Sequence, residues 1–394
     1  MFQDKNLLII SPVYNFFVKD QVDLLSHFFH KIYVLVALNP IAEISNFLPI
    51  NYLKRFRKKT MICLDDKPEN VIVIPTSLLY APTDYHYKQL GHKHFKIVEN
   101  IINKNKIKFD LIHSHFTWSS GYVGAKLKEK YGKPFVVTTH GFDIYLWPFK
   151  DDEWKNKIKY VLNGANQIIT VSQKNLSYIQ KLNCNVPVHI IPNGFRRNLF
   201  NQKNSDECQR NLQIQFNKKI ILSVGNLLEV KGYDFLLKAV YELIQYKKDI
   251  ICFIIGVGPL KNKLFKQIKK LGLENHIKLL GGKPHDEIPL WMNACDIFVI
   301  PSLNEGNPTV MFEALGCGKP VIATRVGGIP EIISSDDYGL LVNPSDFKEL
   351  SEKLLFALDK KWDYQKIGQY SELFTMDNIV NRILDVYREA YAAY

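Results

Sequence analysis

Two glutamates eight residues apart are the residues of this sequence that most directly suggest ligand binding. Glu305 stands in the stretch NEGNPT and Glu313 in the stretch MFEALG. Carboxylates are poor ligands for phosphate, but each accepts two hydrogen bonds from neighbouring sugar hydroxyls. The pair therefore favours a ligand that contains sugar. The alternative is that both are solvated surface charges near the start of a helix, where the helix dipole favours carboxylates.

The residues around these glutamates predict a strand, a short helix and a second strand. Residues 296–300 and 320–323 are short apolar runs, which are typical of buried strands in a parallel sheet. Asn307 is expected to cap the helix, with Pro308 at its first position. Backbone N–H groups at this helix start would face the carboxyl edge of the sheet, where such sheets bind anions. We therefore expect phosphate to bind at Gly306, Asn307, Pro308 and Thr309.

Length and composition predict a cytosolic protein of two domains. The 394 residues exceed what one hydrophobic core usually supports. The six cysteines include no Cys-x-x-Cys pair, which is typical of reduced thiols. No apolar stretch reaches the roughly 18 residues of a membrane-spanning helix, and the first residues lack the layout of a signal peptide. We expect a chain that is neither secreted nor membrane-spanning.

The excess of positive over negative charge lies entirely in the first half of the chain. The net charge is +12; residues 1–200 hold 27 Lys and Arg against 15 Asp and Glu, whereas residues 201–394 hold 24 of each. This asymmetry indicates an anionic partner, which could be a membrane surface, a phosphorylated substrate or nucleic acid. The sequence contains no nucleic-acid-binding motif, so we expect an anionic membrane surface and no nucleic acid.

Residues 51–59, NYLKRFRKK, are the candidate for this membrane contact. Five cations stand beside Tyr52, Leu53 and Phe56, a composition typical of a helix that lies at a membrane interface. The alternative is an ordinary solvated basic face. We expect the protein to be peripheral on the cytoplasmic face of the membrane.

Alternating strand and helix patterns in both halves predict two Rossmann-like domains. In the first half, strands are expected at 7–10, 32–38, 111–113, 135–138, 167–171 and 188–191, and a helix at 18–29. In the second half, strands are expected at 220–224, 252–256 and 277–280, and helices at 233–244, 286–293, 347–358, 362–374 and 378–391. His113 and His115 would share one face of a strand and could ligate a metal. No third ligand stands at suitable spacing, so we expect no metal there.

The stretch from Asp296 to Ile333 resembles the E-x7-E signature of the family 4 retaining glycosyltransferases, which have the GT-B fold. The resemblance implies that Glu305 contacts the donor sugar and Glu313 the donor ribose. It also implies a bacterial-type enzyme of cell-surface polysaccharide synthesis, of the teichuronic-acid-like kind. The fold implied is two Rossmann-like domains facing a cleft, with the last helix crossing back to the N-terminal domain.

Other stretches carry the same resemblance. His140, which precedes a glycine at the end of a strand, resembles the family histidine beside the donor sugar, and Asp143 is expected to position acceptor or sugar hydroxyls. The turn GNLLEVKG resembles the family turn in which an arginine and a lysine bind the donor diphosphate. Lys231 stands at the lysine position, but Asn226 replaces the arginine, so the site has one cation fewer. We expect Gly256 and Gly258, in GVGP, in the wall of the nucleotide pocket.

A Pro-Asn-Gly turn at 192–194 resembles the end of the first domain in this family. Arg196 stands where an acidic residue is often found, and we group it with the acceptor-binding residues. The predicted domains are 1–195 together with the helix 377–394, which bind the acceptor, and 196–376, which bind the nucleotide sugar.

We predict a retaining hexosyltransferase in which His140, Lys231 and Glu305 act in catalysis. The donor is a nucleotide-diphosphate sugar, with UDP favoured and GDP possible, and the acceptor is a glycan or a lipid-linked glycan. The sequence holds no Asp-x-Asp motif, so no metal or other cofactor is expected. The alternatives are a sugar phosphorylase or nucleotide-sugar epimerase on the same fold, and a non-catalytic partner protein, which Asn226 would suit.

Overall fold

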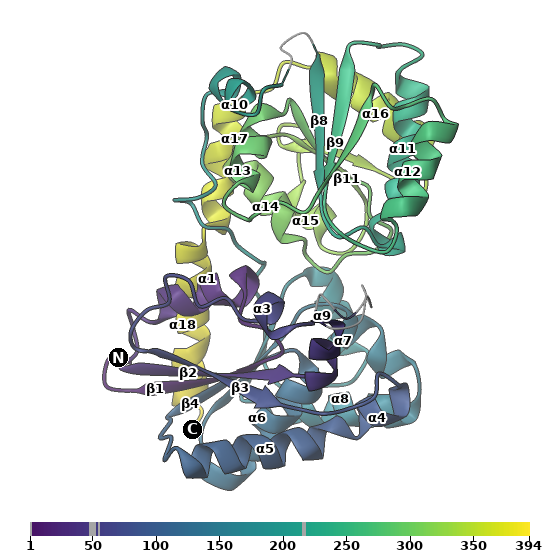
Figure 1. Ribbon diagram of the computed structural model, residues 1–394. Helices are drawn as coiled ribbons and strands as arrows, with labels where there is room; N and C mark the ends of the chain where they lie inside the picture. Colours follow the sequence, from purple (N-terminus) through teal and green to yellow (C-terminus); the bar gives the residue numbers. More distant parts are fainter. Residues whose placement is uncertain (1, 47–52, 54–55, 215–217) are drawn as a thin grey trace. The chain divides into compact units, whose positions relative to one another are not determined.

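The computed structural model describes residues 2–46, 53, 56–214 and 218–394 (Figure 1). The chain divides into two compact units, Met1–Pro192 with Met376–Tyr394, and Asn193–Thr375. Each unit is built on a parallel sheet with helices on both faces, as predicted for two Rossmann-like domains. Among the described residues, no helix is both long enough and apolar enough to cross a bilayer. The six cysteines are free thiols.

The first unit contains a seven-stranded parallel sheet in its described residues. The strand order is β3-β2-β1-β4-β5-β6-β7. The strands are β1 Asn6–Ser11, β2 Lys31–Leu38, β3 Val71–Ser77, β4 Leu111–His115, β5 Phe135–Thr139, β6 Gln167–Thr170 and β7 Val188–Ile190. In register, Leu7 of β1 pairs with Ile32 of β2 and with Leu111 of β4.

Helices cover both faces of this first sheet (Figure 1). They are α1 Phe16–Leu25, α3 Lys58–Met61, α4 Asp84–Lys88, α5 Leu90–Lys104, α6 Tyr122–Tyr131, α7 Phe142–Tyr145, α8 Asp152–Gly164, α9 Gln173–Gln180 and α18 Met376–Ala392. Three further helical segments, which are not α-helical, are η1 Pro40–Asn46, η2 Thr117–Gly121 and η3 Trp147–Phe149. The last helix, α18, belongs to the first unit although it ends the chain, as the predicted fold class requires.

The second unit contains a six-stranded parallel sheet of order β10-β9-β8-β11-β12-β13 in its described residues. Its strands are β8 Lys219–Val224, β9 Ile250–Ile255, β10 Ile277–Gly281, β11 Ile297–Ile300, β12 Val321–Thr324 and β13 Gly339–Val342. Its helices are α10 Ser205–Asn211, α11 Tyr233–Leu243, α12 Lys261–Lys270, α13 Ile288–Ala294, α14 Thr309–Gly316, α15 Ile329–Ile332, α16 Phe347–Asp359 and α17 Tyr364–Ser371, with the turns η4 Glu229–Lys231 and η5 Glu372–Phe374.

The side-chain alternation of β1 explains the layered core. Leu7 and Ile9 pack into the hydrophobic cluster that contains residues of α1 and α18, whereas Leu8 and Ile10 pack into the cluster with residues of α5 and α6. Successive residues of a strand point to opposite faces, so an unbroken apolar run buries both faces. Figure 1 shows α1 and α18 on one side of this sheet and α5, α6 and α8 on the other.

Two strands were not predicted from the sequence. The strand β3 includes Pro75, which breaks the usual strand pattern but is tolerated because β3 lies at the edge of its sheet. The strand β13 has only four residues and also lies at an edge. Of the basic stretch at 51–59, residues 51–52 and 54–55 lie outside the described residues, and the predicted interfacial helix is not tested there.

Candidate active site

The predicted donor residues lie where the strand order of the second sheet reverses. β8 stands between β9 and β11, with β10 beyond β9 and β12 beyond β11. The loops that leave β8 and β11 at their carboxyl ends therefore diverge, and sheets of this kind bind ligands at that point. Lys231 follows β8 and Glu305 follows β11. The topology thus brings together two residues that are 74 positions apart.

Lys231 and Glu305 form an ion pair. The Lys231 Nζ donates to Glu305 Oε1 at 2.6 Å, and Ser302 Oγ donates to the same oxygen at 2.7 Å. The side chains of Lys231 and Glu305 are 25% and 10% exposed. An ammonium group has three N–H donors, and Glu305 accepts from one of them. The pair therefore holds a cation in place and leaves it able to donate to an anionic ligand.

A close backbone contact fixes the turn that carries Lys231. Gly232 has a φ of +66°, and a Cβ on it would stand 1.9 Å from the carbonyl oxygen of Pro301. Leu303 N donates to Val230 O at 2.7 Å across the same contact. Only glycine permits this approach, because any side chain would collide with the backbone. The η4 turn is thereby locked against the loop that follows β11.

The predicted cap of α14 is wrong by one residue. Pro308 occupies the N-cap position, and the helix begins at Thr309 with no side-chain cap. Asn307 Oδ1 instead accepts from Asn193 N at 2.9 Å, and Asn193 Nδ2 donates to Asn307 O at 2.6 Å. The asparagine is unavailable as a cap because it bridges to a residue 114 positions away. The helix N-terminus therefore has no side chain of its own to satisfy its first N–H groups.

Glu313 lies in the second turn of α14 and has a partner that the sequence did not indicate. Its side chain is 5% exposed, and its Oε1 lies 3.0 Å from His285 Nε2. The ring of Phe200 packs against His285, with 5.2 Å between the ring centroids. A buried carboxylate with one partner keeps further lone pairs for a ligand hydroxyl.

Two glycines bring the β8 and β9 loops together. A Cβ on Gly256 would stand 1.8 Å from Gly225 O, and one on Gly258 would stand 2.3 Å from Leu227 O. Leu227 N donates to Val257 O at 2.9 Å. Between these contacts Asn226 is exposed, so its amide can reach a ligand.

The loop that carries Glu305 is also held by a later glycine pair. Gly328 N donates to Gly306 O at 2.8 Å, and a Cβ on Gly327 would stand 2.0 Å from Glu305 O. These contacts position the backbone of the loop between β11 and α14.

In the first unit, Asp143 organises the loop of His140. Its carboxylate accepts from the backbone N–H groups of Thr117 at 3.0 Å, His140 at 3.1 Å and Gly141 at 2.8 Å. Its side chain is fully buried, and burial raises its pKa to about 6, although these hydrogen bonds act in the opposite direction. Asp143 was expected to contact ligand hydroxyls, whereas the structure engages both of its oxygens with backbone. It therefore positions His140.

His140 is paired with His115, which was not assigned a role from the sequence. His115 Nδ1 and His140 Nε2 are 3.1 Å apart, and the two rings stack. Burial lowers the pKa of His115 to about 3, and burial followed by the neighbouring His115 lowers the pKa of His140 well below its usual value. Both imidazoles are therefore neutral near pH 7, and one N–H lies between them.

The other strand histidine, His113, has both ring nitrogens engaged by protein groups. Nδ1 lies 2.7 Å from Tyr387 OH, and Nε2 lies 2.7 Å from Thr138 Oγ1. Across the part of the chain that the structure describes, no group of three or more His, Cys, Asp or Glu could hold a metal ion.

The structure groups most of the predicted donor residues in the second unit. Lys231 and Glu305 contact each other, whereas Gly306, Asn307 and Glu313 are held by Gly328, Asn193 and His285 respectively. His140 and Asp143 lie in the first unit, and Arg196 lies in the second unit, half-exposed, directly after Phe195. Sequence reasoning gave no site role to Ser302, His285, His115 or Asn193. Ser302 follows the end of an apolar strand, His115 was considered only as a metal ligand, and Asn193 only as part of the Pro-Asn-Gly turn, whereas nothing in the sequence singled out His285.

Comparison with known proteins decides the family. Residues 204–374 match the family described as glycosyl transferases group 1, and residues 60–198 match the one described as Glycosyltransferase Family 4. An uncharacterized glycosyltransferase of Methanocaldococcus jannaschii is 33% identical over 311 residues, which cover 75% of this chain and 79% of that protein. The chain belongs to the family 4 glycosyltransferases. It is therefore a transferase, as predicted, and family 4 membership favours this over the phosphorylase and epimerase alternatives.

Two further similarities are informative for this glycosyltransferase. TuaC of Bacillus subtilis, whose name assigns it to teichuronic acid biosynthesis, is 27% identical over 309 residues, which cover 78% of this chain and 76% of TuaC. The structure of HepE from Anabaena in complex with UDP superposes with a TM-score of 0.74 at 20% identity, covering 98% of this chain and 100% of that one. The GT-B fold class is thereby confirmed.

Proposed function

We propose that this glycosyltransferase transfers a sugar, with retention of configuration, from a nucleotide-diphosphate sugar to a glycan or lipid-linked glycan of a surface polysaccharide. The observation that carries the proposal is the convergence of Lys231, Glu305 and Ser302 at the reversal of strand order, beside a helix N-terminus without a side-chain cap. The similarity to HepE, whose structure holds UDP, supports UDP as the nucleotide. The similarity to TuaC supports a polysaccharide product.

Each part of the nucleotide-sugar donor has a matching group of residues in the site. The diphosphate is held by Lys231 and by the N–H groups at the start of α14, since both supply positive charge. Asn226 adds an uncharged donor. Glu305 accepts from hydroxyls of the transferred sugar, and Glu313 accepts from the ribose, with its carboxylate oriented by His285.

In the reaction, negative charge develops on the departing diphosphate while the sugar becomes oxocarbenium-like. Hydrogen-bond donors that are already in place at the phosphate stabilise this charge, and each of them lowers the activation barrier by about 3 kcal/mol. We propose that Lys231 and the backbone N–H groups supply this stabilisation without a divalent metal. The chain has no Asp-x-Asp motif to hold one.

Retention follows if the acceptor attacks from the face on which the diphosphate leaves. The acceptor oxygen then bonds to the anomeric carbon as the bond to the diphosphate oxygen breaks, and that diphosphate oxygen takes the hydroxyl proton. His140, held by Asp143 and by His115, is neutral and can donate a hydrogen bond to the transferred sugar. We assign Arg196 to the acceptor side, where its charge suits an anionic acceptor.

The test is donor turnover in the purified chain. Slow hydrolysis of UDP-glucose, UDP-N-acetylglucosamine, GDP-mannose and ADP-glucose is followed by release of the nucleotide and by NMR of the freed sugar. We expect one UDP-sugar to be preferred and the sugar to appear first as the anomer present in the donor. Appearance of the opposite anomer would overturn retention, and release of no nucleotide from any donor would overturn the proposed donor class.

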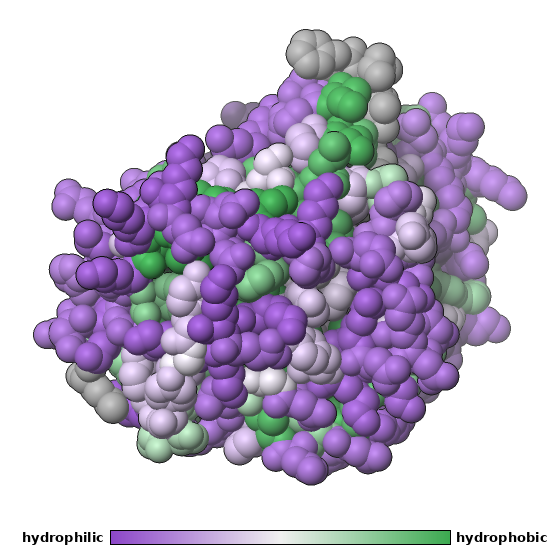
Figure 2. All heavy atoms as spheres, turned by 90° about the horizontal axis from the view of Figure 1, so that it is seen from below, coloured by the Kyte–Doolittle hydropathy of each residue, from purple (hydrophilic) through white to green (hydrophobic). Residues whose placement is uncertain are grey.

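We also propose that the basic first half binds anionic membranes. Lys58 and Lys59 are exposed at the start of α3, while Arg57 Nε donates to Ser45 Oγ at 2.7 Å. The face drawn in Figure 2 is mostly hydrophilic, with smaller apolar areas. The exposed cations Lys58 and Lys59 favour electrostatic attraction to anionic lipid. A variant with the five cations of 51–59 replaced by serine should lose binding to phosphatidylglycerol liposomes. Unchanged liposome binding would contradict the proposal.

A further inference from the structure

A cavity of about 600 Å³ lies within the first unit. Residues that follow β2, β3 and β4 line it, together with parts of α4, α7 and η3. This volume is within the range of about 300–1,000 Å³ for sites that bind small molecules. Seven aromatic side chains form much of its wall: Phe56, Tyr80, Tyr87, Phe116, Trp118, Phe142 and Trp147.

The polar groups in this wall are largely engaged with protein partners. Asn39 Nδ2 donates to Tyr80 O at 2.8 Å, and Ser119 Oγ lies 2.8 Å from His94 Nδ1. Asp84 Oδ1 accepts from Trp154 Nε1 at 3.1 Å. A sugar ring in this cavity would leave hydroxyls without partners, which is costly. A hydrocarbon has no such requirement and gains from contact with the aromatic wall.

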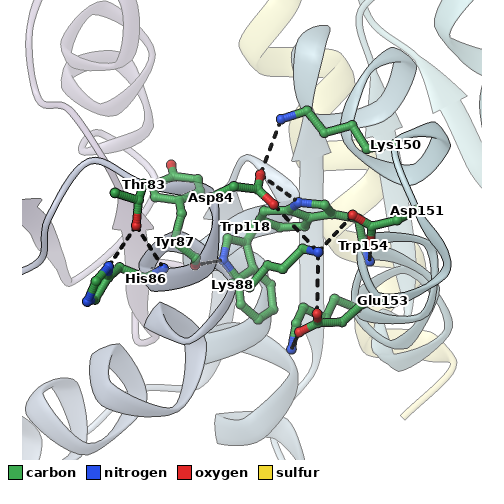
Figure 3. Close-up of polar contacts among 11 residues, drawn as sticks. Thr83, Asp84, His86, Tyr87, Lys88, Trp118, Lys150, Asp151, Glu153 and Trp154 are labelled. Atoms are coloured by element: carbon green, nitrogen blue, oxygen red, sulfur yellow. Dashed lines mark hydrogen bonds and ion pairs between the residues drawn. The ribbon is translucent and has the colours of Figure 1, made fainter.

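A cluster of charged side chains borders one side of the cavity (Figure 3). Lys88, whose side chain is 13% exposed, contacts Asp84 at 3.5 Å, Asp151 at 2.7 Å and Glu153 at 3.3 Å. Lys150, which lines the cavity, lies 3.3 Å from Asp84. These contacts tie α4 to the start of α8. The wall is therefore formed before any ligand binds, which lowers the entropic cost of binding.

The cavity adjoins His140 through a single layer of aromatic rings. Phe116 lines the cavity and packs against His140 with 4.5 Å between ring centroids. Phe142 also lines it and packs against Phe116 at 5.6 Å and against Trp147 at 4.9 Å. A ligand bound in the cavity would therefore be separated by the ring of Phe116 from the residue that we place next to the reacting sugar.

We propose that the cavity binds the hydrocarbon portion of a lipid-linked acceptor, with the acceptor hydroxyl emerging at the His140 side. This inference rests on the proposed transfer reaction, because it assigns the acceptor of that reaction to an amphipathic class. On this proposal, Phe116, Phe142 and their neighbours are the residues that select a lipid-linked acceptor over a free glycan.

The test compares octyl β-D-glucopyranoside with methyl β-D-glucopyranoside by isothermal titration calorimetry, below the concentration at which the octyl compound forms micelles. We expect the octyl glucoside to bind at least about tenfold more tightly, because its longer chain buries more apolar surface. Equal affinity for the two glucosides, or no binding of the octyl compound, would overturn the proposal.

Three variants test whether octyl glucoside binds in this cavity. Phe142 is 42% exposed, so Phe142→Asp is expected to fold, and it should weaken octyl glucoside binding about tenfold. Phe149→Asp is the matched control, because Phe149 is 48% exposed and stands outside the cavity lining; it should change binding less than about twofold. Ala37→Phe, which fills the cavity from a half-buried position, should also weaken binding. Equal losses in Phe142→Asp and Phe149→Asp would overturn the assignment.

Titration of UDP into the same samples separates this proposal from the one on which it rests. Binding of UDP without binding of octyl glucoside would overturn the cavity assignment alone. If octyl glucoside binds but UDP does not, the result would support the assignment of the cavity and contradict the proposed nucleotide-sugar donor.

Discussion

Replacement of Lys231 by methionine should abolish most of the turnover. Methionine keeps much of the apolar stem but removes the cation that lies 2.6 Å from Glu305 Oε1. If Lys231 stabilises the departing diphosphate, its loss should cost about 3 kcal/mol of barrier, which is roughly 10²–10³-fold in kcat. Loss of the cation from the ground-state complex should weaken UDP binding as well.

The same replacement should also lower the free energy of unfolding. The side chains of Lys231 and Glu305 are 25% and 10% exposed, so the pair is intermediate between surface and buried ion pairs. Exposed pairs contribute about 0–1 kcal/mol, and removal of one partner from a buried pair costs about 3–5 kcal/mol. We expect a loss of about 1–3 kcal/mol on this scale. The double variant Lys231→Met/Glu305→Gln removes the unpaired charge and should recover much of this loss without recovering turnover.

The assay measures nucleotide release from the preferred UDP-sugar, and urea denaturation gives the unfolding free energy of each variant. If Lys231→Met retained kcat within about threefold of wild type, the role assigned to Lys231 would be refuted. If the double variant recovered turnover together with stability, the role of the pair would be structural only.

Three further predictions test other parts of the site. Glu313→Ala should raise the donor KM about tenfold with little change in kcat, whereas Glu305→Gln should chiefly lower kcat; equal effects on donor affinity in steady-state kinetics would contradict this division of roles. Gly258→Ala would place a Cβ 2.3 Å from a backbone oxygen and should cost about 1–3 kcal/mol in urea denaturation, while the control Gly282→Ala, whose Cβ would meet only a side chain at 3.0 Å, should cost less. Burial lowers the pKa of His94 from 6.5 to about 4. Its contribution to stability is therefore complete above pH 6.5 and is lost as the pH falls toward 4, so His94 alone should account for a loss of about 2 kcal/mol between pH 7 and pH 5. His113, His115 and His140, whose pKa values burial also lowers, add losses of their own. His94→Gln should therefore reduce the slope of the stability curve in this range without removing it, and an unchanged slope would show that His94 does not contribute.

The inner strands of both sheets were predicted well, whereas the helices α5, α6 and α8 were not predicted. Apolar runs such as those of β1, β8 and β11 are buried on both faces, so they are recognisable without knowledge of their neighbours. Edge strands are less apolar or shorter, and β3 with its Pro75 and the four-residue β13 were missed for that reason.

The contacts that build the site were less predictable, because they join distant parts of the chain. The pairing of Lys231 with Glu305 depends on β8 lying beside β11, which no local pattern specifies. The predicted cap at Asn307 followed a sound local rule, and it failed because Asn193 competes for the same amide. The partner of Glu313, His285, lies in a loop between β10 and α13 without any motif.

The most direct test of the central claim is a calorimetric titration of UDP, GDP and ADP, without added metal, into wild type and Lys231→Met. A donor site at the junction of β8, β11 and α14 predicts that UDP binds to wild type and that Lys231→Met binds it at least about tenfold more weakly. Equal binding of UDP to both proteins would place the nucleotide elsewhere. Failure of all three nucleotides to bind would contradict a nucleotide-sugar donor at this site.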